Sequence, residues 1–286
     1  MRLRAVPYAR GVTRLSELSG SRELMANLTL RELRSKYKRS ALGWAWSLLN
    51  PLATMLIFTV VFEFFLHVNP DRGRPSGLKS FPFFLLVGLV PWNFLANGVN
   101  GSMSALLANS NLVKKVYFPR ETLIAANVAS FIVALLIELG VLAVALVIAG
   151  NFVLPWLVPT LLLVAVQAVF VFGLGLALGV LNVYFRDVPH LVGGILLQLW
   201  FYATPIVYPP GFVHGEIHLF GHVVAVRTLY DLNPMVRFVR AYRNLLYDLR
   251  MPALADWAYV VAAALVALGL GAVVFTRLEP KLAEEL

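Results

Sequence analysis

The feature that most constrains this chain is a set of five long stretches without a single Asp, Glu, Lys or Arg. They run over residues 41–62, 81–113, 139–185, 188–215 and 257–276, and they hold 22, 33, 47, 28 and 20 residues. About 20 apolar residues cross a bilayer as one helix, so each stretch is long enough for at least one span. Only 14% of the 286 residues are charged, which excludes an ordinary soluble enzyme. The sequence therefore predicts an all-α polytopic membrane protein.

Six spanning helices account for these stretches. The longest stretch must contain a turn, and Gly150-Asn151 followed by Pro155 indicates its place. With the N-terminus inside, 16 Lys and Arg residues lie on the inner side and 8 on the outer side, so the positive-inside rule places both termini in the cytoplasm. The net charge of +9 is then mostly an orientation signal, and we expect no nucleic-acid partner. The spans are predicted at about 41–66, 82–105, 123–149, 154–182, 190–208 and 256–276.

Residues 1–40 form a basic arm before the 41–276 membrane domain, and 277–286 form a cytoplasmic tail. The arm has two possible helix starts, Ser21, or Thr29 with Glu32 as a capping box. An imperfect stripe of Leu24, Leu28, Leu33 and Tyr37 predicts an amphipathic helix lying on the anionic leaflet, either as an anchor alone or also in contact with a cytoplasmic partner. Its basic and aromatic interfacial residues are Arg31, Arg34, Lys36, Tyr37, Lys38 and Arg39.

Two segments carry a resemblance to a known family. RELRSKYKRSALGWAWSLLNPLATMLIFTVVF and NLVKKVYFPRE combine a basic helix, Leu-Gly-x-x-Trp, Leu-x-Asn-Pro and a basic aromatic loop. The chain resembles, over about residues 22–276, the permease subunits of type-2 ATP-binding-cassette exporters for O-antigen, teichoic acid, capsule and galactan. The resemblance implies a homodimer in the bacterial cytoplasmic membrane that joins an ATPase subunit and exports a lipid-linked polysaccharide. It also implies short outer re-entrant gate helices between spans five and six.

Energy for transport must come from another polypeptide. The phosphate cradle G-x-x-x-x-G-K-[ST] is absent, and no Gly-Lys dipeptide occurs in the chain. The chain is therefore predicted to be no enzyme and to bind no cofactor, with ATP and magnesium on the partner subunit. It has no cysteine, which excludes disulfides and thiolate metal sites.

The loop between spans two and three is the best docking segment for that partner, because it is short, basic and aromatic. The matching family loop holds the coupling helix, so the resemblance assigns ATPase coupling to Lys114, Lys115, Tyr117, Phe118, Pro119, Arg120 and Glu121. The alternative is a basic inner loop that only obeys the positive-inside rule. Arg186 and Asp187 form a second candidate, unless they pair with each other.

A glycan path should offer aromatic platforms and neutral polar groups, because sugars present C–H faces and hydroxyls. Asn93 and Asn100 in span two and Gln198 and Thr204 in span five supply such polar groups. Pro91, Pro205 and Pro209-Pro210 are expected to break the helices. The predicted channel residues are Trp92, Phe94, Asn97, Trp200, Phe201, Tyr202 and Tyr208.

The 45-odd residues between spans five and six contain an amphipathic segment after Asn233-Pro234. Arg237, Arg240 and Arg243 are predicted to meet the phosphate of a lipid carrier at an outer gate. The alternative is an interfacial helix that holds membrane-lipid phosphates.

For several polar or small residues the sequence allows more than one role. Glu63 and Glu138 are ionisable within spans, and Glu138 is expected to make a structural hydrogen bond to Gln167 or Asn127. Gly173, Gly175 and Gly179 give span four a small face, either for packing within the chain or for a subunit seam. His214, His218 and His222 would share a face only on a helix, and we favour a solvated loop over a metal site.

Two other functions remain alternatives. A type-2 exporter of a drug or simple lipid fits less well with the short outer loops and the basic arm. A membrane-embedded glycosyltransferase would need clustered acidic residues, whereas Asp231, Asp248 and Asp256 form no D-x-D pattern.

Overall fold

The computed structural model describes residues 22–36, 45–68, 70–116, 118–212, 216–219 and 222–285. Five helical segments in this part are long and apolar enough to span a membrane. They are Leu48–Phe65, Phe81–Ala108, Glu121–Ile148, Leu154–Tyr184 and Leu254–Lys281. The predicted spans two, three, four and six coincide with them within five residues, since hydropathy and turn residues fix both position and length. The first span was predicted at 41–66 and is found at Leu48–Phe65, and residues 41–44 lie outside the described part of the chain.

The predicted fifth span, 190–208, has a shorter helix than expected. A π-helical segment η4 (Pro189–Leu196) continues into α8 (Leu197–Tyr202), and the helix ends at Ala203. Pro205 comes two residues later and has no N–H to continue the helical hydrogen bonds, so the predicted break there is confirmed. Helices η4 and α8 together cover 14 residues, which at 1.5 Å each is about 21 Å, less than the hydrocarbon core.

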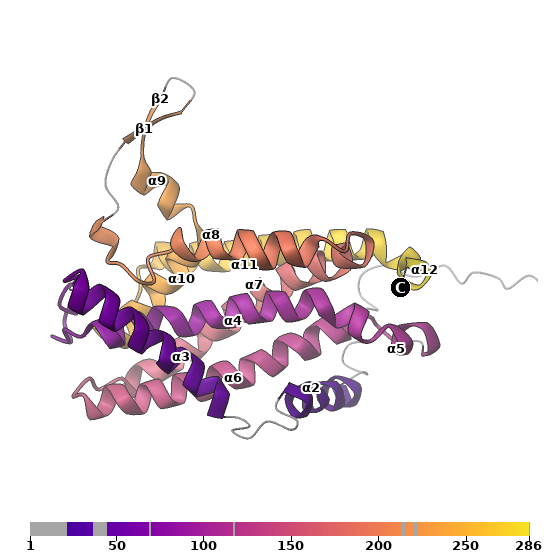
Figure 1. The fold of residues 1–286 in the computed structure, drawn as a ribbon, viewed down its shortest axis with the longest axis horizontal. Coiled ribbons are helices and arrows are strands. Elements are labelled where there is room, and N and C mark those ends of the chain that lie inside the picture. The colour runs from indigo at the N-terminus through magenta and orange to yellow at the C-terminus, as the bar shows by residue number, and fades with distance from the viewer. Residues whose placement is uncertain are drawn as a thin grey trace, which may run out of the picture.

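The four helices α4 (Phe81–Ala108), α6 (Glu121–Ile148), α7 (Leu157–Tyr184) and α11 (Leu254–Leu278) form the bundle (Figure 1). Helix α4 packs against both α6 and α7, and α7 packs against α11. Most of α4 is buried, because it is largely apolar and lies between its neighbours. The first span, α3 (Trp46–Phe58) with the π-helical η2 (Thr59–Phe65), packs across α4 and keeps most of its surface exposed.

Opposite ends of the bundle carry different elements. In Figure 1, α5 (Ser110–Lys115) and α12 (Leu282–Glu285) lie at one end, and α10 (Pro234–Tyr242) lies at the other. The remaining elements are short: η3 (Leu154–Trp156), η5 (Pro210–Phe212), β1 (Glu216–Leu219), β2 (His222–Ala225), α9 (Val226–Asp231), η6 (Arg243–Asp248) and η7 (Glu279–Lys281).

The hairpin of β1 and β2 was not expected from the sequence. Its strands pair antiparallel, with Leu219 opposite His222 and His218 opposite Val223. These two histidines therefore lie on separate strands rather than one helix, and His214 lies outside the described residues. The four-residue spacing thus does not align them as a helical metal-ligand pair.

Two proline and glycine expectations had opposite outcomes. The turn predicted at Gly150-Asn151 is confirmed, since Gly150 has a φ of 86° and Asn151 donates from Nδ2 to the Leu246 carbonyl at 2.8 Å. The break predicted at Pro91 is wrong, because α4 runs through it. Neighbouring α7 supports the helix there, since Gln167 donates to the Pro91 carbonyl at 2.8 Å.

The small face of α7 packs within the chain. A Cβ on Gly173 would collide with the backbone of α11 at Ala267 and Leu268, and one on Gly175 would press on Ser102 of α4. Gly271 of α11 faces Gly173 so closely that a Cβ would overlap its carbonyl. Small residues on both helices therefore let α7 and α11 approach closely.

Candidate functional site

Helix α5 and its flanks form the exposed link between spans two and three. Asn109 ends α4 and precedes α5, and its carbonyl accepts from the backbone N–H groups of Leu112 and Val113. Val113 is buried, whereas Lys114 and Lys115 in the last turn are exposed. The apolar residue thus anchors α5 to the bundle, and the two ammonium groups face outward.

The other predicted coupling residues divide between surface and packing. Phe118 packs half-buried against the apolar cluster beneath α5, and Arg120 donates to the Glu279 carbonyl at 2.6 Å. Pro119 is half-buried, and Glu121 begins α6, where a carboxylate favours the positive end of the helix dipole. Tyr117 lies outside the described residues. Lys114, Lys115 and the half-exposed Val116 are therefore the outward-facing part of this set.

The second coupling candidate, Arg186-Asp187, is an exposed turn between α7 and η4. The hydroxyl of Tyr184 donates to the Leu278 carbonyl at 2.7 Å, which places this turn beside the end of α11 that leads into α12. Among the described residues, no ion pair joins Arg186 to Asp187, so the alternative in which the two pair with each other is not formed. The turn lies at the same end of the bundle as α5 (Figure 1).

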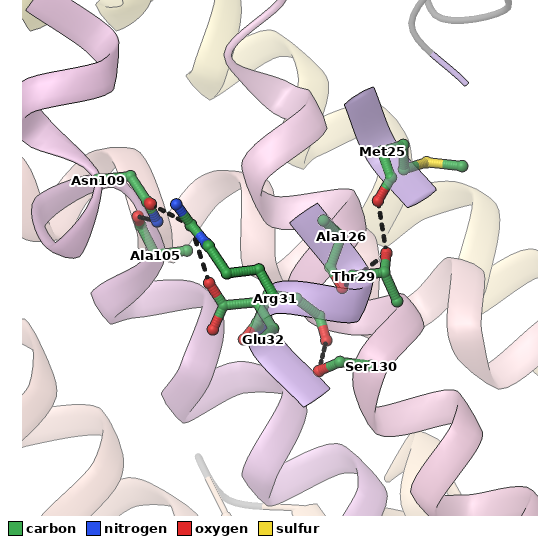
Figure 2. A network of polar contacts seen from close by, with 9 residues as sticks. Met25, Thr29, Arg31, Glu32, Ala105, Asn109, Ala126 and Ser130 are labelled. Carbon is green, nitrogen blue, oxygen red and sulfur yellow. Dashed lines mark hydrogen bonds and ion pairs between the residues drawn. The ribbon is translucent and has the colours of Figure 1, made fainter. Parts of the chain in front are cut away.

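A polar network joins α2 (Arg22–Lys36) to this end of the molecule. Figure 2 shows the guanidinium of Arg31 donating to the side-chain oxygen of Asn109 and also pairing with Glu32 at 3.1 Å. Asn109 in turn donates from Nδ2 to the Ala105 carbonyl at 2.8 Å. Sequence reasoning did not single out Asn109. Its one signal is an Asn, a capping residue, between the apolar run of span two and the basic loop.

Helix α2 packs its apolar side on the bundle. Leu28 and Leu33 are buried, and Leu28 shares an apolar cluster with Val113 of α5 and Ile124 of α6. Of the two possible helix starts, the one at Thr29 is wrong, because Thr29 lies inside α2 and donates to the Met25 carbonyl at 2.7 Å. Helix α2 begins at Arg22, next to the alternative start at Ser21. Arg31 and Arg34 are exposed, although the Arg31 guanidinium reaches Asn109. The Lys36 side chain is not described, and Tyr37, Lys38 and Arg39 lie outside the described residues.

The predicted channel aromatics form a packed cluster. Trp92 and Phe94 are buried, and Trp92 makes edge contacts with Trp200 and Phe201 at centroid distances of 6.0 and 5.5 Å. The indole of Trp200 donates to Asn233 at 2.6 Å, which fixes α8 to the start of α10. Trp92, Trp200 and Phe201 therefore pack against one another in this structure, and Trp200 and Phe201 are half-buried.

Two of the predicted channel residues are open to the outside of the chain. Asn97 of α4 and Tyr202 at the end of α8 are exposed. Tyr208 is half-buried and donates its hydroxyl hydrogen to the Tyr202 carbonyl at 2.7 Å. These positions flank the packed cluster.

The three arginines predicted to meet a phosphate divide between two environments: Arg237 and Arg240 share carboxylate partners, and Arg243 lies apart from them. Arg237 donates to Asp256 at 2.6 Å, which raises its pKa, and Arg240 pairs with Asp231 and lies 3.5 Å from Asp256. Two carboxylates thus neutralise two guanidinium groups. The three aspartates considered for a glycosyltransferase serve ion pairs, since Asp248 lies 3.2 Å from Arg250.

Arg243 does not lie where a lipid phosphate could reach it. Its side chain is buried and donates to the carbonyls of Phe84, Pro205 and Ile206 while its guanidinium covers the Phe84 ring at 3.4 Å. Burial lowers the pKa of Arg243 to about 9, so the group stays charged at neutral pH. The predicted phosphate role of Arg243 is corrected to a structural one, because its side chain donates to the Phe84 carbonyl of α4 and to the carbonyls of Pro205 and Ile206, which follow the end of α8.

The hydrogen bonds expected for Glu138 are not formed. Gln167 accepts from the Tyr242 hydroxyl at 2.9 Å and donates to Pro91, and Asn127 donates to Ser102 at 3.2 Å. Glu138 lies elsewhere, half-buried on α6, and takes part in another polar interaction of the chain. Glu63 is half-buried in η2.

Comparison with known proteins decides the family. The family model described as ABC-2 type transporter matches residues 23–247. The chain belongs to the ABC-2 type transporter family. Within that family it is 31% identical to an O-antigen export system permease protein of Myxococcus xanthus, over 94% of this chain and 98% of the relative.

Further ABC-2 relatives are more distant. An O-antigen export system permease protein of Klebsiella pneumoniae is 29% identical over 78% of this chain and 80% of its own. A polysialic acid transport protein of Escherichia coli is 26% identical over 64% of this chain and 68% of its own. The ABC-2 match includes α2, α5, the aromatic cluster and α10.

Proposed function

We propose that this chain is the transmembrane permease subunit of an exporter that moves a lipid-linked polysaccharide across the bacterial cytoplasmic membrane. The observation that carries the proposal is the 31% identity, across nearly the full length of both chains, to an O-antigen export permease. The second group of relatives, named for polysialic acid transport, supports a polysaccharide cargo. No relative reported above is named for a drug or simple lipid.

The chain contributes no nucleotide chemistry in this proposal. It lacks a phosphate cradle, so ATP and magnesium bind an ATPase subunit that docks on the exposed basic surface of α5. Lys114, Lys115 and Val116 offer charge and apolar area there, with the Arg186-Asp187 turn beside them. ATP-driven closure of the ATPase would shift α5 and, through Asn109, the spanning helix α4 as one body.

The proposed topology places both termini in the cytoplasm. It counts η4 with α8 as the fifth of six membrane segments, shorter than the other five. Both α3 and α8 leave apolar side chains exposed, among them Leu56 and Leu199 at 62% each. Exposed faces of this kind suit lipid or a second copy, and a homodimer would place two such sets around one path. Asn97 and Tyr202 are exposed, and in this proposal they contribute to the same path.

A depletion experiment tests the cargo. Cells depleted of this chain should lose one surface polysaccharide and accumulate its lipid-linked form on the cytoplasmic side, as measured by glycan blotting of fractionated membranes. Re-expression of the intact chain should restore the surface glycan. Normal surface glycans with altered drug tolerance would instead support the alternative of a drug or lipid exporter.

A further inference from the structure

A polar pocket lies between three helices at membrane depth. It has a volume of about 180 Å³ and is bounded by the start of α3, the middle of α4 and the middle of α6. Four polar side chains line it: Asn50, Asn93, Asn97 and Glu138. Trp46 and Phe94 are among its apolar walls.

The depth of this pocket makes its polarity informative. Asn93 and Asn97 are four residues apart on one face of α4, which spans the membrane from Phe81 to Ala108. Glu138 lies within α6, the most apolar of the candidate spans. Amide and carboxylate groups at this depth are costly unless they face protein or water, so a cluster from three helices indicates a functional surface.

The far side of α6 shows the contrast. There, Leu136, Leu139 and Val144 line a groove shared with α7, whose walls are almost wholly apolar. That groove suits lipid tails. The same helix therefore presents a lipid-like face on one side and a hydrogen-bonding face on the other.

The chemistry of the lining selects a ligand class. Each carboxamide offers two N–H donors and a carbonyl acceptor, and the carboxylate accepts only. Among the described residues that line the pocket there is no Lys or Arg, and the carboxylate would repel an anion, so a phosphate is disfavoured. Vicinal hydroxyls match paired amides, and the C–H face of a ring can lie on Trp46. The volume equals about six waters, taking ~30 Å³ for each, which admits a single ring and not a chain.

We propose that the pocket binds one neutral sugar ring of the polysaccharide during transit, with Asn93 and Asn97 as hydrogen-bonding residues. The inference rests on the proposed export function, since it names a binding site along the route of the exported polysaccharide. Glu138 contributes an acceptor from the facing helix.

The cysteine-free sequence permits a direct accessibility test. Ala134 lines the pocket, and Ala134→Cys leaves every polar wall residue in place. Leu136→Cys, two residues further along α6 on the apolar groove, is the matched control. With a charged, membrane-impermeant maleimide on the full complex, we expect Ala134→Cys to react at least roughly tenfold faster, because a thiolate does not form in hydrocarbon.

Sugar binding is tested by comparing two strains. One makes the glycan, and the other lacks the first glycosyltransferase of its synthesis. Labelling of Ala134→Cys should fall when glycan is in transit, and adding Asn93→Leu with Asn97→Leu should remove this protection. Asn97→Cys serves as a second reporter if Ala134→Cys is poorly expressed.

Three outcomes would overturn the inference. Equal labelling of Ala134→Cys and Leu136→Cys means that the pocket is not wet. Fast labelling of Ala134→Cys in both strains means that no sugar binds. Slow labelling in both strains means that something other than the glycan covers the pocket, which assigns it to a lipid head group. If the unsubstituted complex still exports glycan in any of these cases, the proposed function stands and the pocket assignment alone fails.

Discussion

At the scale of single residues, Arg243 best explains how the end of the bundle that carries α10 holds together. Helix α8 ends at Ala203 and leaves the carbonyls of Pro205 and Ile206 without helical partners, and Arg243 of η6 supplies the donors. Its guanidinium also lies over Phe84. One planar fork thus joins three segments that are far apart in the sequence.

Replacing the planar guanidinium of Arg243 with the ammonium group of lysine is expected to destabilise the protein. Arg243→Lys keeps the charge but cannot reach three carbonyls, so buried acceptors lose partners at about 1–3 kcal/mol each. Thermal denaturation followed by size-exclusion fluorescence should show a midpoint several degrees lower. Arg227→Lys, an exposed position on α9, is the control and should leave the midpoint unchanged. Equal midpoints for the two variants would contradict the structural role.

Sequence reasoning reached the residue scale only in part. The amphipathic segment predicted after Asn233-Pro234 forms α10, and its apolar residues Val236, Val239 and Tyr242 are all buried. The sequence could not separate Arg243 from Arg237 and Arg240, because their roles depend on carbonyls and carboxylates from other segments. Arg31 and Asn109 are 78 residues apart, and no local pattern predicts that they meet.

At the scale of helices, the close approach of α7 and α11 sets a strict size limit. Gly271→Ala would drive a Cβ into the Gly173 carbonyl, whereas Gly269 of the same helix has open space around it. Overpacking costs about 1–3 kcal/mol, so Gly271→Ala should lower the thermal midpoint and the yield of folded protein. Gly269→Ala should match the parent chain. A parent-like Gly271→Ala would mean that the two helices are further apart than the structure places them.

The contact between α2 and α5 is expected to matter for coupling. Arg31→Ala removes the donor that holds Asn109 from α2, so motion of α5 should no longer carry α2 with it. We expect the complex to keep ATP hydrolysis while the export of glycan per ATP falls. Arg34→Ala removes the same charge from an exposed position one turn along, and it should leave this ratio near that of the parent. Parallel losses in both variants would indicate a general charge effect.

The ends of α5 provide a prediction for partner binding. Lys114→Glu with Lys115→Glu reverses two exposed charges without touching Val113, which anchors the helix. Copurification of the partner ATPase subunit should fall sharply, while the thermal midpoint of the chain stays the same. Phe118 and Arg120 are poorer probes, because both also hold the fold together. Undiminished copurification would move the docking surface to the Arg186-Asp187 turn or elsewhere.

At the scale of the whole molecule, hydropathy predicted most of the architecture. Five predicted spans, the turn at Gly150 and the break at Pro205 agree with the structure, since apolar length and turn chemistry are local properties. The hairpin of β1 and β2 and the continuation of α4 through Pro91 were missed. The first has no strong turn signal, and the second depends on support from α7.

The central claim is ATP-driven export of a polysaccharide by a complex that contains this chain. It is tested most directly in inside-out proteoliposomes that hold the chain, its ATPase and radiolabelled lipid-linked glycan. We expect ATP, and not a non-hydrolysable analogue, to make the glycan resistant to a glycosidase added outside. Glycan that stays fully accessible after ATP hydrolysis would contradict the account.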